Sequence, residues 1–395
     1  MKKSEILKRE KIIYLDNAAT SWPKPVEVCK AISNFIENIG ANPGRSGHHL
    51  SSEAARVVYQ AREAVAKLFN APDPLRVVFG QNITEALNLV ILGFLHPGDH
   101  VITSSMEHNA VMRPLRFLES KGVELTVIES PSVCIIDPQA IEENIRKNTK
   151  LIVINHASNV TGTILPVREI GKIARKHNLL LLTDEAQTGG AYSVDMEEDY
   201  IDLLTFTGHK SLLGPTGTGG LILGRRVNHL DIDPLTRGGT GSNSENEEQP
   251  DFLPDRFESG TLNACGLAGL GAAIKWISKT GLHNIRAHEI RLSQRLIDGL
   301  NEITGVKVYG SWNARDQTAT VSFTIQGIDN AKIGSLLDDT FSILSRIGLH
   351  CSPAAHKTLG TYPQGTVRLS IGYFNNEQEI DQAIQAVHKI AKGKV

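Results

Sequence analysis

From about residue 75 to residue 224, short runs of Val, Ile and Leu alternate with segments whose apolar residues recur at helical spacing. Such short runs, bounded by turn residues, are typical of strands that are buried on both faces. We expect strands at 75–79, 100–103, 123–128, 150–155, 179–184, 201–206 and 219–223, with helices at 85–95, 111–120, 138–146 and 167–177. Strands that alternate with helices predict a mostly parallel sheet with helices on both faces.

The flanking segments add further elements to this α/β pattern. Amphipathic helical spacing recurs at 26–39, 53–69, 263–279 and 282–304. The tail reads as strand, strand, helix, strand, helix, at 306–309, 318–325, 331–338, 366–371 and 376–391. We therefore expect a large domain over 26–279, a small α+β domain over 280–395, and an N-terminal segment, 1–25, that packs on the small domain. The polar, acidic segment 238–254 is rich in Gly, Ser, Asn and Pro and predicts a surface loop or lid.

Composition and charge indicate a soluble globular protein. Lys and Arg total 41 and Asp and Glu total 43, which argues against a nucleic acid partner. No apolar stretch reaches the roughly 20 residues of a membrane span. Residues 1–11 are charged and lack the apolar core of a secretory signal, so we expect a cytoplasmic protein. The four cysteines, at 29, 134, 265 and 351, are too scattered for a disulfide framework, and no CxxC spacing suggests structural zinc.

Lys210 and Asp184 form the most informative pair of polar residues. Asp184 ends one expected strand, and Lys210 follows the next in the turn Thr207-Gly208-His209-Lys210. Ligands in open α/β sheets bind beyond the carboxyl ends of the strands. A lysine amine can join covalently to an aldehyde cofactor, and a carboxylate can keep a pyridine nitrogen protonated. The pair predicts pyridoxal 5'-phosphate (PLP), although an isolated lysine is more often a surface charge and an isolated Asp a strand cap.

Further polar residues complete a possible cofactor site. Gln187 follows Asp184 by three positions and can contact the ring hydroxyl. Thr84 opens an expected helix, whose N-terminus favours a phosphate, although an ordinary helix cap is the competing interpretation. Thr207 and His209 can add phosphate donors. His108 follows a strand and can stack on the pyridine ring, but a single loop histidine is more often a surface residue.

Cys351 has the sequence context of an exposed nucleophile. It lies among Gly348, His350, Ser352 and Pro353, between two expected elements, whereas buried cysteines are usually inert. His350 or His356 nearby can favour the thiolate, which is the reactive form. The same three side chains lack an evident fourth ligand for a metal, so we expect no metal site.

Nine segments together give the chain a resemblance to a known family. They are 14–20, 84–85, 107–109, 158–162, 184–187, 207–210, 257–261, 346–353 and 367–370. In this order, over nearly the whole chain, they resemble class V aminotransferase-fold enzymes, and specifically the branch of cysteine desulfurases and selenocysteine lyases. The resemblance implies a PLP-dependent transferase of fold type I, similar to aspartate aminotransferase.

The resemblance also implies a role for each matching residue. Lys210 carries the cofactor and shuttles a proton, Asp184 pairs with the pyridinium, Gln187 contacts the ring oxygen, and His108 stacks on the ring. The remaining cofactor contacts are Thr84, Thr207 and His209 at the phosphate, Asn159 beside the ring, and Thr261 at the phosphate of a neighbouring subunit. Arg368 and Asn159 bind the substrate carboxylate, and Arg45 and His48 line the rim across a homodimer with a shared active site. Two residues depart from the family pattern, Glu185 in place of a small residue and Thr207 in place of Ser.

The resemblance places Cys351 at the position of the sulfur acceptor in desulfurases. The implied reaction removes sulfur from L-cysteine, releases L-alanine and leaves a persulfide on Cys351. Arg368 follows Cys351 by only 17 positions, a spacing that resembles the branch needing a separate sulfur-acceptor protein. Alternatives are a selenocysteine lyase acting on L-selenocysteine, transamination, β-elimination, or a sulfur-carrier scaffold without turnover. Iron–sulfur cluster assembly, tRNA thiolation and sulfide supply all remain open as pathways.

Overall fold

A seven-stranded sheet forms the centre of the larger part of the molecule, in a computed structural model that describes residues 12–44, 47–131 and 134–394. In spatial order its strands are β2 (Val77–Gly80), β8 (Gly219–Leu223), β7 (Leu203–Thr207), β6 (Leu180–Asp184), β5 (Thr149–Asn155), β3 (His100–Ser104) and β4 (Glu124–Ile128). Strands β7, β6, β5, β3 and β4 are parallel, while β8 is antiparallel to β2 and β7. The expected α/β fold with a mostly parallel sheet is confirmed.

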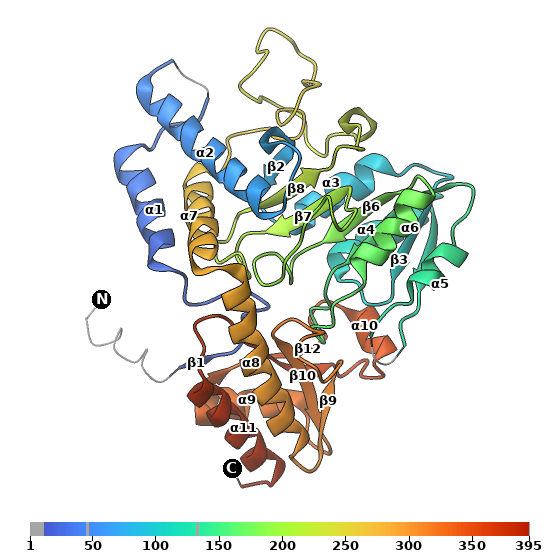
Figure 1. Cartoon of the computed structure of the whole chain (residues 1–395), viewed down its shortest axis with the longest axis vertical. Coiled ribbons are helices and arrows are strands. Elements are labelled where there is room, and N and C mark those ends of the chain that lie inside the picture. The colour runs from blue at the N-terminus through green and yellow to red at the C-terminus, as the bar shows by residue number, and fades with distance from the viewer. Residues whose placement is uncertain (1–11, 45–46, 132–133, 395) are drawn as a thin grey trace.

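Both faces of this sheet are covered because its strands are apolar on both sides. Leu151 and Val153 of β5 pack in one core with α3 (Ile83–Phe94) and α4 (Asn109–Glu119). Ile152 and Ile154 face the opposite core, since successive side chains of a strand alternate between faces. That second core includes side chains from α1 (Val26–Asn38), α2 (His49–Leu68), α5 (Pro138–Glu143), α6 (Val167–Lys176) and α7 (Ala264–Thr280). Figure 1 shows α1, α2 and α7 together on one side.

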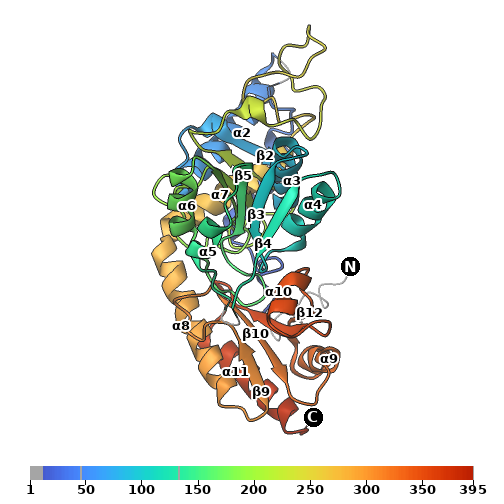
Figure 2. The same cartoon turned by 90° about the vertical axis from the view of Figure 1, so that its right-hand side faces the viewer.

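A smaller unit lies below the large sheet in Figures 1 and 2. Its antiparallel sheet has the order β12 (Arg346–Gly348), β13 (Thr366–Ser370), β10 (Thr320–Ile325), β9 (Val306–Tyr309). The sheet packs against α8 (Leu282–Asn301), α9 (Asn330–Phe341) and α11 (Glu377–Ala391), and the short helix α10 (Pro353–Thr358) follows β12. Helix α8 runs between the units, with Ile285 in the core of the large sheet and Leu292 in that of the small one.

The N-terminal strand joins the small unit rather than the large one. Strand β1 (Ile13–Tyr14) pairs in parallel with β11 (Ile343–Leu344), and Leu15 is fully buried in the small unit's core. From there the chain crosses to the large sheet and enters α1. The sequence pattern did not indicate β1, β11, β12 or α10, because each is short and β1 exists only through a partner 330 positions away.

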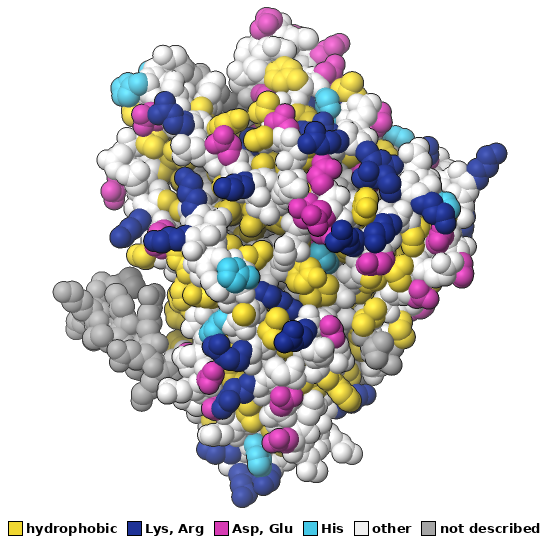
Figure 3. Space-filling view, viewed as in Figure 1, with side chains coloured by type: hydrophobic (Ala, Val, Ile, Leu, Met, Phe, Trp, Pro, Cys, Tyr) yellow, Lys and Arg dark blue, Asp and Glu magenta, His cyan; other side chains and the backbone are white. Residues whose placement is uncertain are grey.

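Residues 238–254 contain no helix or strand and protrude beyond α2 and β2 in Figures 1 and 2. Two 3-10 turns, η2 (Pro74–Arg76) and η3 (His229–Asp231), complete the elements described. Acidic and basic side chains intermingle on the face shown in Figure 3, as the near-equal charge totals lead one to expect. Within the described residues, every helix is too short or too polar to cross a membrane.

Candidate active site

Lys210 and Asp184 come together because β6 and β7 are adjacent and parallel. Asp184 is the last residue of β6 and pairs in register with Thr205 of β7, five positions before Lys210. Burial lowers the pKa of Lys210 to about 8, against the attraction of Asp184, which would raise it. Burial likewise raises the pKa of Asp184, while a hydrogen bond from the Ala186 N–H (2.9 Å) and the charge of Lys210 oppose that shift. The site therefore pairs an acid with an amine that gives up its proton near pH 8.

The N-terminal segment clamps the turn that carries Lys210. The His209 carbonyl accepts hydrogen bonds from the Thr20 hydroxyl (3.0 Å) and the Lys24 ammonium (2.7 Å). The Ser21 hydroxyl donates to the Lys210 carbonyl at 2.7 Å, and the Ser21 N–H donates to the His209 carbonyl at 3.0 Å. These bonds fix the backbone of Lys210 and leave its side chain to react.

His108 lies at the start of α4, and its pKa is affected by the charge of Lys210. Its Nδ1 accepts the Ala110 N–H at 3.0 Å and so caps the helix. Burial, together with the charges of Lys210 and Arg346, lowers the pKa of His108 to about 4. A neutral imidazole at this position suits stacking on a protonated pyridine better than an imidazolium does.

Two buried polar atoms lie where a phosphate is expected. Thr207 Oγ1 and His209 Nδ1 are buried and have no hydrogen-bond partner, which is costly unless a ligand supplies one. Helix α3 begins nearby, because Gly219 pairs with Thr207 and lies so close to the Asn82 backbone that a Cβ at position 219 would clash with it. The N-cap of α3 is Asn82, whose side chain accepts the Glu85 N–H, so Thr84 is not the cap. Thr84 lies exposed in the first turn, where backbone N–H groups lack helical acceptors.

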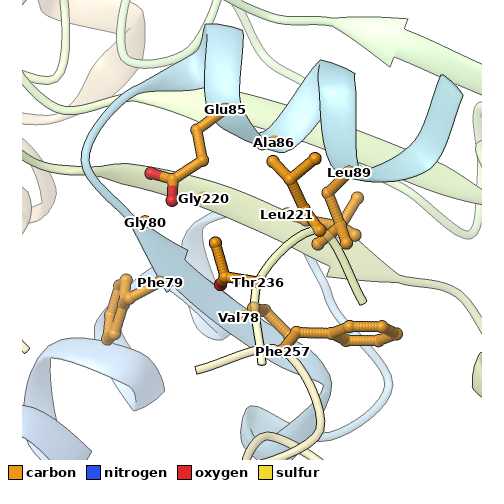
Figure 4. A pocket seen from close by; sticks show the side chains of 11 residues that line it. Val78, Phe79, Gly80, Glu85, Ala86, Leu89, Gly220, Leu221, Thr236 and Phe257 are labelled. Atoms are coloured by element: carbon orange, nitrogen blue, oxygen red, sulfur yellow. The ribbon is translucent and has the colours of Figure 1, made fainter. Parts of the chain in front are cut away.

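The cavity in Figure 4 lies beneath the start of α3, and neither Thr207 nor His209 lines it. It measures about 20 Å³ and is lined by Phe79, Glu85, Leu89 and Phe257 among others. That volume holds about one water molecule. The Glu85 carboxylate accepts the Gln81 N–H at 2.6 Å, so it stabilises the entry to α3.

Cys351 is exposed, but the loop that carries it is tightly held. Cys351 and His350 both have left-handed backbones, with φ of 61° and 49°. The Asn159 side chain donates to the His350 carbonyl at 2.7 Å and accepts from the Ser352 hydroxyl at 2.6 Å. The Asn109 N–H donates to the Cys351 carbonyl at 2.9 Å. These contacts hold a strained loop, so the thiol is presented in one place.

Arg346, rather than a histidine, supplies positive charge beside the thiol. Its Nη2 lies 3.6 Å from Cys351 Sγ. The prediction that His350 or His356 favours the thiolate is wrong, because burial lowers the pKa of His356 to about 4 and that of His350 further. Both imidazoles are therefore neutral at pH 7. Their rings lie 5.5 Å apart and bond to threonine hydroxyls of Thr366 and Thr361.

Arg368 lies in β13, opposite Arg346 in register, and is 1% exposed. Its Nη1 donates to the Asn159 carbonyl and its Nη2 to the Asp16 carboxylate, both at 2.9 Å, while Nε has no partner. Burial lowers the pKa of Arg368 and the charge of Asp16 raises it. Arg368 is thus held rigidly beside the Cys351 loop.

The structure also shows contacts for three further predicted residues, Gln187, His48 and Thr261. The Gln187 amide donates to the Ala18 carbonyl at 3.2 Å, in the clamping segment. His48 caps α2 by accepting the Ser51 N–H, and Thr261 Oγ1 accepts from Asn42 at 3.5 Å. Arg45 lies outside the described residues. Sequence reasoning assigned no role to Arg346, Asp16 or Lys24. Asp16 falls within the matching segment 14–20, which was the one available signal for it.

Comparisons with known proteins agree with this geometry. The sequence profile of the class-V aminotransferases matches residues 13–383. The chain belongs to this family. Within it, a probable cysteine desulfurase of Methanothermobacter thermautotrophicus is 35% identical over 96% of this chain and 94% of its own length. A cysteine desulfurase of Haloferax volcanii is 32% identical over 95% of this chain and 88% of its own.

Solved structures place the chain in the same branch. The apo structure of the cysteine desulfurase from Thermococcus onnurineus superposes with a TM-score of 0.91, at 33% identity, covering 100% of this chain and 99% of that one. The Escherichia coli cysteine desulfurase CsdA has a TM-score of 0.86 at 26% identity, covering 98% and 96% of the two chains. This class-V enzyme is therefore of the cysteine desulfurase family, which implies PLP as its cofactor.

Proposed function

We propose that this chain is a cysteine desulfurase that takes sulfur from L-cysteine onto Cys351 and releases L-alanine. The observation that carries the proposal is the fixed coupling of the Cys351 loop to the Lys210 site. Asn159 bonds to that loop through its side chain and to Arg368 through its carbonyl. The charges of Cys351 and Arg368 both act on the pKa of Lys210.

The donors in the site fit PLP. Thr207 Oγ1, His209 Nδ1 and the first turn of α3 offer hydrogen bonds to its phosphate, Asp184 offers a carboxylate to its ring nitrogen, and His108 offers a neutral ring to its face. When bound, PLP withdraws electrons from the α-carbon of the substrate. Asn159 and Gln187 contribute amides beside the ring.

The residues of this chain then move protons and hold the substrate. Lys210, with a pKa lowered to about 8, accepts the α-proton of cysteine and returns a proton to the product. Arg368 holds the substrate carboxylate, for which its unpaired Nε is available. The Cys351 thiolate attacks the substrate sulfur: an S–S bond forms, the C–S bond breaks, and the carbon takes a proton. Cysteine plus the Cys351 thiol thus gives alanine plus the Cys351 persulfide.

We further propose that the persulfide passes to an acceptor protein at the groove between α4 and α10. This groove has a volume of about 600 Å³ and adjoins the Cys351 loop through Asn109 and Pro353. Arg113, Arg116 and Lys357 line it, with Glu129 as the opposing charge. Such a surface favours an acidic partner. Charge reversal at Arg113 and Lys357 should slow persulfide transfer to an acidic peptide thiol but not to 2-mercaptoethanol.

A homodimer with a shared active site is also part of the proposal. Thr261 is exposed and accepts a hydrogen bond from Asn42, which suits a role toward a second subunit. Sedimentation analysis should give twice the 43.0 kDa chain mass. We retain the domain limits 26–279 and 280–395, an N-terminal segment 1–25 that packs on the small domain, and a cytoplasmic location as predictions.

The decisive experiment is turnover with L-cysteine and a reductant, with alanine and sulfide both quantified. We expect equal amounts of each. Cys351→Ala should keep cofactor binding and lose sulfide release, whereas Cys29→Ala, at an exposed cysteine of α1, should retain both. Full desulfuration by Cys351→Ala would exclude the role given to this thiol. L-selenocysteine tested in parallel distinguishes a lyase, and pyruvate in place of alanine would indicate β-elimination.

A further inference from the structure

A buried ion pair lies directly behind the acid that faces the cofactor. Glu185 follows Asp184 at the end of β6, and its Oε2 lies 2.7 Å from His156 Nδ1. The Thr188 hydroxyl also donates to this Oε2. The two side chains are 0% and 5% exposed for Glu185 and His156, and Glu185 Oε1 has no hydrogen-bond partner. A carboxylate so deeply buried requires a cation beside it.

The surroundings of His156 favour its charged form. Burial lowers its pKa, but the charge and hydrogen bond of Glu185 and the charge of Asp199 outweigh burial and raise it overall. The Tyr192 ring meets the imidazole edge-on at 5.4 Å. His156 also lines a cavity of about 420 Å³ that is separate from the Lys210 cluster. The other charged groups lining that cavity are Arg168, Glu169, Asp199, Arg315 and Asp316.

The pair matters because Asp184 and Glu185 are adjacent buried acids. The charge of Glu185 raises the pKa of Asp184, and Glu107, also buried, lies within range of Asp184. Uncompensated negative charges this close cannot all persist in a poorly solvated site. An imidazolium on Glu185 cancels its charge and leaves Asp184 free to ionise.

We propose that His156 is a positioning residue for the cofactor site: as the cationic partner of Glu185, it lets Asp184 alone serve as the charged acid beside the cofactor nitrogen. This inference rests on the proposed function only in assigning Asp184 to that nitrogen. It gives a use to Glu185, the residue at which the chain departs from the small side chain of the family pattern. Without His156, an ionised Glu185 would place a second negative charge beside Asp184 and oppose the ionisation of Asp184.

The test compares the PLP dissociation constant of variants over a pH range. In His156→Gln, Glu185 stays buried without its cationic partner, so a higher pH, which favours a charged carboxylate, places an uncompensated charge beside Asp184. We expect the ratio of dissociation constants, His156→Gln over unmodified protein, to be below about threefold at pH 6.5 and to exceed about tenfold at pH 9. The double variant His156→Gln/Glu185→Gln should bring the ratio back below about threefold at both pH values, because no charge remains to compensate.

A matched control is the surface pair of His177 and Glu142, whose Nε2–Oε1 distance is 2.6 Å. His177→Gln should leave the dissociation constant unchanged at every pH. A flat ratio for His156→Gln between pH 6.5 and 9, or failure of the double variant to restore binding, would overturn the proposal. If His156 had a purely structural role, the double variant would fail to restore binding.

A second measurement tests the proposal even if the His156→Gln protein fails to fold. Histidine-labelled protein without cofactor allows the His156 ring to be titrated by NMR. Its pKa should lie above the ordinary histidine value in unmodified protein and fall below it in Glu185→Gln. An unchanged titration would overturn the pairing. Both readouts are independent of turnover, so a chain that failed to release alanine from cysteine would refute the proposed function and leave this test intact.

Discussion

Arg346 Nη2 lies 3.6 Å from the Sγ of Cys351, in a loop where both nearby histidines are uncharged. A guanidinium at this distance stabilises negative charge on sulfur, and the thiolate is the form that reacts. Arg346→Gln should therefore slow alkylation of Cys351 by iodoacetamide at pH 7 by roughly threefold to tenfold. Mass spectrometry of the labelled peptides gives the rate, and the exposed Cys29 in the same sample is the internal standard. Equal slowing at both cysteines would contradict a local effect.

The lowered pKa of Lys210 predicts how the protein captures its cofactor. Only the neutral amine attacks an aldehyde. With a pKa of about 8, the neutral fraction of Lys210 rises roughly tenfold between pH 7 and pH 9 and then levels off. Stopped-flow absorbance after mixing PLP with cofactor-free protein should show the capture rate following this curve. Lys210→Arg should show no capture, and a rate still rising steeply above pH 9 would indicate an ordinary lysine.

Glu107 should make stability depend on pH in the direction opposite to most acids. Burial raises its pKa to about 8, although hydrogen bonds from Ser104 and Asn155 oppose that shift. In the unfolded chain the Glu107 carboxyl ionises near pH 4.5. Its favourable contribution to the free energy of unfolding is therefore present below that pH and is lost as pH rises toward 8. Glu107→Gln should therefore gain roughly 2–4 kcal/mol relative to unmodified protein between pH 5 and pH 8.

Urea denaturation at the two pH values measures this gain at fixed protein concentration. The exposed Glu119 provides the control, because Glu119→Gln should give the same difference from unmodified protein at both. A Glu107→Gln protein whose relative stability did not change with pH would show that Glu107 is ionised in the fold.

The buried pair of Arg62 and Glu258 should be important for stability but not for chemistry. Both nitrogen–oxygen distances are 2.8 Å, and the Phe79 N–H also donates to the Glu258 carboxylate. Arg62→Met leaves that carboxylate buried and unpaired, which costs about 3–5 kcal/mol. Arg62→Met/Glu258→Met should recover much of the loss, whereas Arg295→Met, at an exposed pair with Asp381, should change the urea midpoint little. A double variant as unstable as the single one would show that packing, and not charge, dominates.

Much of the large unit could be predicted from sequence because its pattern is local. The seven strands follow apolar runs, and the strand-ending position of Asp184 places it at the ligand edge. The pattern is less accurate at the ends of elements. Helix α2 begins at His49, before the predicted position 53, because the His48 side chain accepts the Ser51 N–H and caps the helix there. Periodicity alone contains no information about such a cap.

The contacts that define the site were beyond sequence reasoning because they join distant positions. Asn159 reaches His350 across 191 positions, and Arg368 reaches Asp16 across 352. The resemblance named Asn159 and Arg368 as ligands of substrate but gave no hint that they hold the Cys351 loop and the N-terminal segment. The neutrality of His350 and His356 depends on burial, which only the fold provides.

The stretch from Ile13 to Lys24 connects the small unit to the turn that carries Lys210. At one end it is a strand of the small unit, and Asp16 holds Arg368 of that unit. At the other end Thr20, Ser21 and Lys24 grip the carbonyls around Lys210. A displacement of the small unit would therefore be passed along this stretch of backbone, so that the Arg368 guanidinium and the Lys210 amine would shift together.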